Sequence, residues 1–139
     1  MTDASTLRVF TQESANRTLP LVRRIVEDIV VQFERWQARV KEFEVVSASH
    51  TVATPEPRAA ELEQEMEALA RELEHYKEEL AGIGVELKDY VHGLVDFPAV
   101  RDGRPIYLCW RLGEPSVEYW HEVDAGFPGR IRLDPIGAF

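Results

Sequence analysis

The chain has 139 residues, 45% of them hydrophobic, and a formal net charge of −9 from 16 Lys and Arg against 25 Asp and Glu. This balance predicts one folded domain over residues 1–139, and the negative charge argues against binding to a phosphate backbone. The single cysteine, Cys109, excludes an intrachain disulfide. No apolar run is long enough to span a membrane and the first residues do not resemble a secretory signal, so we expect a cytoplasmic protein.

Residues 12–83 are predicted to form two long helices. Thr11 suits the N-cap of the first, and Pro20 predicts a kink or a new helix start within residues 18–20. Two apolar seams with heptad spacing indicate a coiled coil. The first seam is Leu19, Val22, Val26, Ile29, Phe33, Trp36, Val40 and Phe43, and the second is Leu62, Met66, Leu69, Leu73, Tyr76, Leu80 and Ile83.

Residues 47–57 contain two prolines and small polar residues, which predicts a loop between the two helices. We therefore expect an antiparallel helical hairpin in which Arg39 and Glu65 lie near each other. The second arm is strongly acidic, which is typical of a solvated helix face, with a docking surface for a basic partner as the alternative. Extra apolar residues on the first arm, Leu21, Ile25 and Val30, predict a cover formed by the C-terminal half of the chain or by a second copy.

The C-terminal part, residues 84–139, is predicted to form a small antiparallel sheet. Gly82 and Gly84 suit the end of the second helix. Short strands are expected at 85–88, 94–100, 106–112 and 117–122. Asp102-Gly103 is typical of a two-residue hairpin turn, and residues 113–116 predict a second turn. The chain is thus predicted to be an α+β protein, with the sheet packed on the base of the helical hairpin.

The two turns predict a strand register. Asp96 faces Cys109 and Phe97 faces Leu108 across the first hairpin. Across the second, Cys109 faces Trp120, and Arg111 faces Glu118 as a cross-strand ion pair. One face should then pack on the helices, with Val95, Phe97, Ala99, Ile106, Leu108, Trp110, Leu112, Val117, Tyr119 and His121. The other should be polar, with Asp96, Tyr107, Cys109, Arg111, Glu118, Trp120 and Glu122.

This register places His121 on the apolar face near the start of the first helix, where Glu13 and Asn16 could bond its ring nitrogens. One interpretation is a satisfied structural histidine. The alternative is a ligand or general base in a crevice between sheet and helices. The candidate catalytic residues are His121, Glu114, Asp96 and Arg130, and the candidate ligand-binding residues are Glu13 and Asn16.

No metal and no cofactor is assigned from the sequence. Metal-ligating groups lie on neighbouring strands and turns, namely Asp96, Glu114, His121, Glu122 and Asp124, but the register sends Asp96 and His121 to opposite faces. Cys109 has no activating base on its own face, which favours a structural thiol over a nucleophile. His50 and His75 lie outside these patterns and are interpreted as bystanders.

Several motifs together resemble one family. They are Phe10-Thr11, Glu13, Ala15-Asn16, Leu19-Pro20, the run from Gly93 to Pro98, the run from Leu108 to Glu114, Tyr119-Trp120-His121-Glu122, Gly126-Phe127 and Gly129-Arg130. With these motifs the chain is similar, over nearly its whole length, to the small bacterial family known as domain of unknown function 2203. The resemblance implies a bacterial cytoplasmic protein and no particular activity, and its polar signature residues are Glu13, Asn16, Asp96, Glu114, His121 and Arg130. They form either a site or a polar clamp that joins the sheet to the hairpin.

Two classes of function follow. The first, which we favour, is a non-enzymatic interaction or scaffold protein that self-associates, for example as a homodimer, or binds a protein partner. It is expected to bind neither nucleic acid nor membrane. The alternative is an enzyme, or a protein that binds a small ligand or metal, with a polar crevice around His121, Glu114 and Arg130. Convergence of these side chains in a pocket would favour the second class, and burial in packing would count against it.

Overall fold

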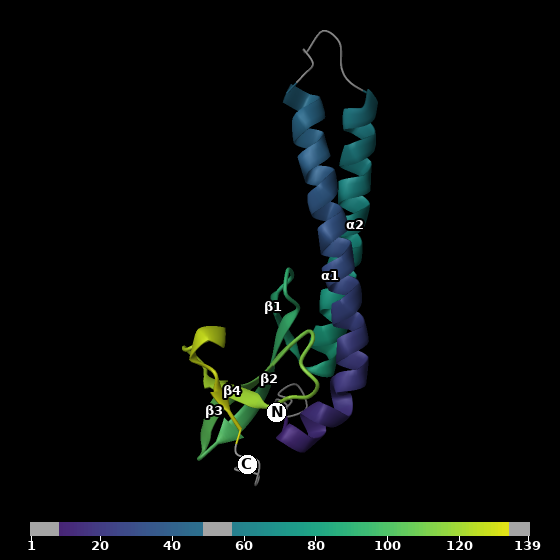
Figure 1. Ribbon diagram of the computed structural model, residues 1–139. Helices are drawn as coiled ribbons and strands as arrows, with labels where there is room; N and C mark the ends of the chain where they lie inside the picture. The colour runs from purple at the N-terminus through teal and green to yellow at the C-terminus, as the bar shows by residue number, and fades with distance from the viewer. Residues whose placement is uncertain (1–8, 49–56, 134–139) are drawn as a thin grey trace, which may run out of the picture.

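The computed structural model describes residues 9–48 and 57–133, which form an α+β domain (Figure 1). Two long helices pack along each other, and a five-stranded antiparallel sheet of order β1-β2-β3-β4-β5 lies beside their base. The elements are α1 (Gln12–Ala48), α2 (Pro57–Ile83), β1 (Glu86–Asp89), β2 (Leu94–Arg101), β3 (Arg104–Arg111), β4 (Tyr119–Glu122), the 3-10 turn η2 (Phe127–Gly129) and β5 (Ile131–Arg132). The first two residues of the predicted loop belong to α1, Pro57 begins α2, and residues 49–56 lie outside the described part.

Helix α1 begins where the sequence predicts. The Ser14 amide donates to Thr11 Oγ1 at 3.0 Å, which satisfies one of the free N–H groups of the first turn. Pro20 lies inside a single continuous helix and does not start a new one. The first turns of α1, in purple, run at an angle to the rest of the helix (Figure 1), as expected where proline removes a hydrogen bond. Neither α1 nor α2 is long and apolar enough to cross a membrane.

The predicted helix pairing is present. Arg39 Nε donates to Glu65 Oε1 at 2.7 Å, as expected for antiparallel arms. Helix α2 ends at Ile83, and the residue that follows it, Gly84, has a positive φ of 100°. The Gly84 amide bonds the Ala81 carbonyl and the Val85 amide bonds the Leu80 carbonyl, the two hydrogen bonds of a Schellman motif. This tight ending turns the chain directly from α2 into β1.

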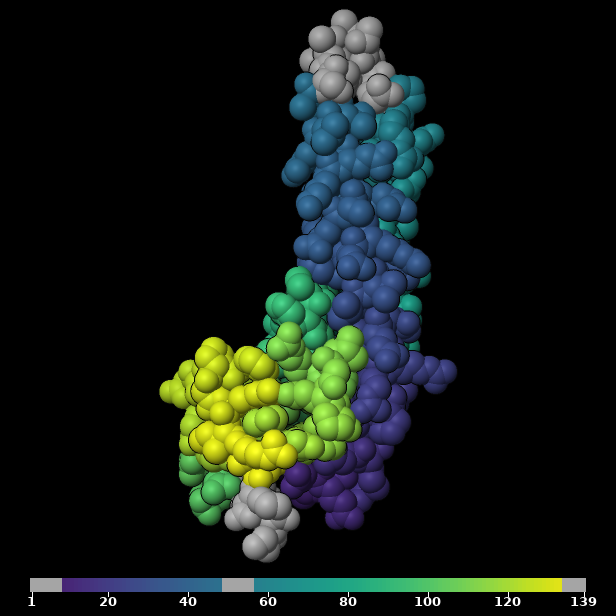
Figure 2. Space-filling model, viewed as in Figure 1, coloured from purple at the N-terminus to yellow at the C-terminus, as the bar shows by residue number. Residues whose placement is uncertain are grey.

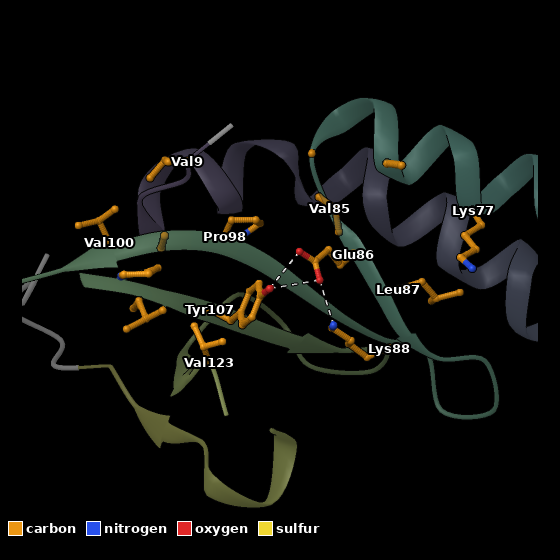
Figure 3. A pocket seen from close by; sticks show the side chains of 15 residues that line it. Val9, Lys77, Val85, Glu86, Leu87, Lys88, Pro98, Val100, Tyr107 and Val123 are labelled. Atoms are coloured by element: carbon orange, nitrogen blue, oxygen red, sulfur yellow. Dashed lines mark hydrogen bonds and ion pairs between the residues drawn. The ribbon is translucent and has the colours of Figure 1, made fainter. Parts of the chain in front are cut away.

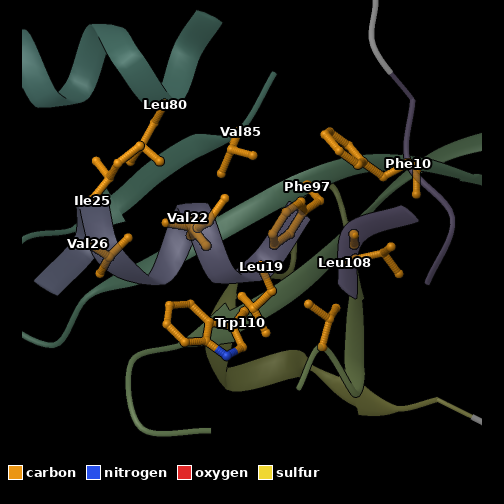
Figure 4. Close-up of a cluster of buried hydrophobic side chains, with 14 of the residues drawn as sticks. Phe10, Leu19, Val22, Ile25, Val26, Leu80, Val85, Phe97, Leu108 and Trp110 are labelled. Carbon is orange, nitrogen blue, oxygen red and sulfur yellow. The ribbon is translucent and has the colours of Figure 1, made fainter. Parts of the chain in front are cut away.

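The core lies between one face of the sheet and the part of the helical hairpin nearest to it, which is the first half of α1 and the second half of α2 (Figure 4). Helix α1 contributes Leu19, Val22 and Val26, while β2 and β3 contribute apolar side chains at every second position. These sheet residues are Val95, Phe97, Ala99, Ile106, Leu108 and Trp110, each at most 3% exposed. Their placement on the helix-facing side confirms that part of the predicted apolar face.

The turn between β1 and β2 lies against one residue of the extra apolar stripe of α1, Val30, while Leu21 of the same stripe is 50% exposed. A Cβ placed on Gly93 would lie 2.7 Å from Val26 Cγ1 and 3.2 Å from Val30 Cγ2. The Tyr90 ring stacks on Phe33 with centroids 5.0 Å apart. Of the two predicted covers for this stripe, the C-terminal half of the chain is therefore in contact with it at Val30.

We expect Gly93→Ala to destabilise the protein more than Gly103→Ala. Both glycines have positive φ, 71° and 77°, so both substitutions add the strain of about 1–2 kcal/mol that an L residue has in this conformation. Only at Gly93 does the new methyl group also overlap Val26, which adds about 1–3 kcal/mol of overpacking. Urea unfolding of the two variants measures the difference, and equal losses would contradict the close approach of this turn to α1.

The first strand register is as predicted and the second is not. Asp96 pairs with Cys109 and Phe97 with Leu108 across the Asp102-Gly103 turn. Leu108, and not Cys109, pairs with Trp120. The difference of one residue moves the side chains of β4 to the opposite faces. Trp120 therefore packs in the core, while Tyr119 and His121 lie on the face that the helices do not cover.

The connection between β3 and β4 explains the difference, because contacts outside the two strands shape it. Asn16 Oδ1 accepts from the Val117 amide at 2.7 Å, and the Trp110 indole donates to the Glu114 carbonyl at 3.0 Å. These contacts hold a connection over residues 112–118 in place of the predicted turn at residues 113–116. The predicted ion pair between Arg111 and Glu118 is absent from the described residues, where Glu118 instead bonds Ser116 and pairs with Arg132.

Candidate functional site

Three metal-ligating side chains meet on the sheet face that points away from the helices. Asp96 of β2 pairs with Cys109 of β3, and His121 of β4 is next along that face, because it pairs with Tyr107. One ligand atom from each of the three residues lies within 4.8 Å of the other two. The prediction that Asp96 and His121 point to opposite faces is therefore wrong.

This cluster is buried. Asp96 is 3% exposed, Cys109 0% and His121 2%. The C-terminal residues after β4, in yellow, lie at the surface on the side of the sheet that points away from the helices (Figures 1 and 2). Their backbone is fixed by the Leu133 amide, which donates to the Glu118 carbonyl at 2.8 Å, and by the β4–β5 pairing. At Asp96, Cys109 and His121 the outer face, predicted to be polar, is therefore buried, whereas Tyr107 and Tyr119 on the same face are only partly buried.

Both ring nitrogens of His121 make hydrogen bonds. Nδ1 lies 2.7 Å from the Glu122 carbonyl oxygen, which only accepts, so Nδ1 carries a hydrogen. Nε2 lies 3.0 Å from Asp96 Oδ1, so one further hydrogen lies between these two atoms. Burial raises the pKa of the Asp96 carboxyl, against the lowering effect of the His121 hydrogen bond. Asp96 and His121 thus share one proton between Oδ1 and Nε2, and a bound cation could replace this proton.

The geometry does not favour Cys109 as a nucleophile. Burial raises the pKa of its thiol to about 12, and the charge of Asp96 acts in the same direction. A base that could take the thiol proton needs a free lone pair, and both His121 nitrogens already bond other atoms. Without a bound cation, Cys109 is a neutral thiol at physiological pH.

Arg130 lies beside Cys109 from the segment that follows η2. Its guanidinium carbon is 3.8 Å from the centroid of Tyr119 and 4.2 Å from that of Phe127, so two rings hold it in place. Nη2 donates to Glu114 Oε2, whereas Nη1 is buried and has no hydrogen-bond partner among the described residues. Proximity to Arg130 lowers the pKa of Cys109, although burial outweighs this effect. Arg130 would thus stabilise a thiolate better than the thiol.

These features fit a transition-metal ion. Thiolate sulfur, imidazole nitrogen and carboxylate oxygen are the zinc ligands found in proteins, and the thiolate disfavours Mg²⁺ and Ca²⁺. A histidine ligand commonly donates its second ring N–H to a carbonyl, as His121 donates to Glu122. With His121 Nε2 as ligand, Asp96 and Cys109 would supply two negative charges against the two positive charges of the ion.

The other candidate residues are placed differently. Asn16 forms a polar clamp: its side chain bonds the Val117 amide and carbonyl and so joins α1 to the β3–β4 connection. Glu13 is exposed and pairs with Arg17, and neither Glu13 nor Asn16 bonds His121 as predicted. Of the remaining carboxylates considered as ligands, Glu114 bonds Arg130, Glu122 bonds Arg104, and Asp124 is exposed.

The prediction of a crevice between the sheet and the helices around His121 is also wrong. His121 lies on the opposite side of the sheet, and Glu114 and Arg130 form an ion pair next to the buried cluster. The sequence held one clue: Asp96 and Cys109 were already predicted to face each other, and a shift of one residue in β4 adds His121 to the same face.

A family model described as "Uncharacterized conserved protein (DUF2203)" matches residues 8–133. No curated protein and no solved structure matches the chain.

Proposed function

The chain belongs to the uncharacterised conserved protein family DUF2203, and we propose that it binds one divalent transition-metal ion of the zinc class through Asp96, Cys109 and His121. The observation that carries this proposal is the approach of three ligand atoms from three neighbouring strands to within 4.8 Å of one another. Three protein ligands leave one position of a tetrahedral ion for water or another small ligand.

Charge balance supports the proposal. Zn²⁺ would replace the proton shared by Asp96 and His121 and the proton of the Cys109 thiol, so that binding releases protons. The resulting centre has no net charge from its three protein ligands and the ion, which lowers the penalty of burying an ion. The Cys109 thiolate would also supply an acceptor beside Arg130, whose Nη1 has none within residues 9–48 and 57–133.

Because all three ligands are buried, we favour a structural role for the ion, in which it stabilises the fold. Bound there, it would join β2, β3 and β4 in the layer that lies opposite the helices. Its free energy of binding would then contribute directly to the stability of the fold. An enzyme with an open crevice at His121 has less support, because the side chain is 2% exposed.

Titration of the metal-free protein with Zn²⁺ in competition with a chromophoric chelator tests the proposal. We expect one equivalent of Zn²⁺ to bind. Cys109→Ser and His121→Gln should each weaken binding by about 10–100-fold or more, because loss of a residue that only hydrogen-bonds a metal ligand already has an effect of this size. His75→Gln is the matched control, because His75 lies exposed on α2. Binding that is the same in wild type and Cys109→Ser would overturn the proposal.

A second candidate is a role of the hairpin as an arm that binds another copy or another protein in the cytoplasm. The fully buried residues of α1 lie between Ala15 and Ile29. Beyond Ile29 the seam is only half-buried, and Val31 and Val45 are 46% and 70% exposed. Light scattering tests self-association: the mass should rise towards that of a dimer with concentration, and a monomer throughout would contradict it.

A further inference from the structure

A separate groove lies where the end of α2, β1 and the edge of β2 meet (Figure 3). Its volume is about 720 Å³, within the range of about 300–1,000 Å³ that is usual for small-molecule sites. Most of its wall is apolar, with side chains that include Val9, Val85, Leu87, Pro98, Val100 and Ile106. Asp96, Cys109 and His121 are not among its lining residues, so the groove is distinct from the proposed metal centre.

Charged groups line the groove next to this apolar wall. Lys88 Nζ pairs with Glu86 Oε1 at 2.9 Å, and Tyr107 OH donates to the same carboxylate at 3.1 Å. The charges of Glu86 and Lys88 therefore compensate each other. Lys77 of α2 also lines the groove, and no carboxylate of the described residues lies within 4.0 Å of its ammonium group. The groove thus offers one ammonium group that makes no ion pair with a carboxylate of the described residues.

This charge contrasts with the rest of the chain. The net charge of the protein is −9 and its lysines are Lys41, Lys77 and Lys88, of which the last two line the groove. Helix α2 is otherwise rich in glutamate. An apolar wall beside a free ammonium group on an acidic protein matches a ligand that has an apolar body and one negative charge.

We propose that this groove binds an amphipathic monocarboxylate of the fatty-acid class. The apolar body would lie along the wall formed by Val9, Pro98 and Val100, whose side chains are exposed or partly exposed, and the carboxylate would pair with Lys77. The Tyr107 hydroxyl and the Glu86 carboxylate are hydrogen-bonded to each other, and the apolar wall ends at this polar pair. Because the groove is open on one side, the head group remains near water and the ion pair contributes modestly.

Fluorescence titration with dansyl-labelled undecanoic acid tests this proposal, followed by displacement with dodecanoate, dodecanol or dodecyltrimethylammonium. We expect saturable binding of the probe and displacement in which dodecanoate is the strongest of the three. Equal displacement by dodecanol and dodecanoate would overturn the assignment of a carboxylate, and absence of saturable binding would overturn the site itself.

Variants locate the binding. Lys77→Gln should weaken probe binding by about 3–10-fold, the value of a partly exposed charged contact, whereas Lys41→Gln on the distal part of α1 should leave binding unchanged. Ala81→Trp places a large ring in the groove from an exposed position of α2 and should abolish binding, with circular dichroism as the check on folding. Wild-type affinity in both Lys77→Gln and Ala81→Trp would place the ligand elsewhere and contradict the proposal.

Discussion

In the absence of metal, His121→Ala is expected to destabilise the protein by about 3–5 kcal/mol, the usual effect of removing one member of a buried polar pair. The substitution leaves the Asp96 carboxyl, itself 3% exposed, without the partner that lies 3.0 Å from its Oδ1. It also creates a cavity below Tyr107, whose ring centroid is 5.6 Å from that of His121. Urea denaturation of metal-free protein measures the loss, which is a large part of the 5–15 kcal/mol typical of a domain.

The informative control is Asp96→Asn. Because Nδ1 of His121 donates to Glu122, Nε2 of a neutral ring can accept a hydrogen from the introduced amide, and the pair keeps its hydrogen bond. We expect this variant to lose less than about 1 kcal/mol of stability while it binds Zn²⁺ much more weakly, because an amide lacks the negative charge. A loss below about 1 kcal/mol for His121→Ala would contradict the structural role of the pair.

Saturation with Zn²⁺ is expected to raise the stability of the wild-type protein by about 4 kcal/mol at a free concentration 1,000 times the dissociation constant. This follows from linkage, since the three ligand atoms are brought together only in the folded chain. For a domain of this length the gain corresponds to an increase in Tm of about 10–20 °C. Differential scanning calorimetry with and without Zn²⁺ provides the measurement.

The same scans with variants and other ions separate the proposed centre from general ion binding. Cys109→Ser and Asp96→Asn should each remove most of the increase in Tm, whereas His75→Gln should retain it. Mg²⁺ at equal concentration should produce no increase, because it prefers oxygen ligands. An equal increase with Mg²⁺, or in Cys109→Ser, would show that the stabilisation arises elsewhere on this acidic surface.

The helical hairpin could be predicted because its causes are local. The apolar seams at heptad spacing, the Thr11 cap and the glycine ending at Gly84 each act within a few residues, and the two helices, the cap and the glycine ending lie where the sequence predicts. The Arg39–Glu65 pair followed from the antiparallel arrangement alone. The β2–β3 register followed from Asp102 and Gly103, which adopt the positive φ values that this turn requires.

The site could not be predicted because its causes are distant in sequence. The β3–β4 connection is held by Asn16, which lies 101 residues before Val117, and by the Trp110 indole. A local turn rule does not contain these contacts, and an error of one residue sends His121 to the wrong face. The segment after β4, which brings Arg130 beside Cys109, also contains a short strand, β5, that the sequence pattern did not predict.

X-ray absorption at the zinc edge, on protein loaded with one equivalent of Zn²⁺, tests the three-ligand centre most directly. We expect one sulfur neighbour at about 2.3 Å, from Cys109, with nitrogen and oxygen neighbours at about 2.0–2.2 Å that include one imidazole. The sulfur contribution should disappear in Cys109→Ser. A spectrum with only oxygen and nitrogen neighbours in the wild type would contradict binding at Asp96, Cys109 and His121.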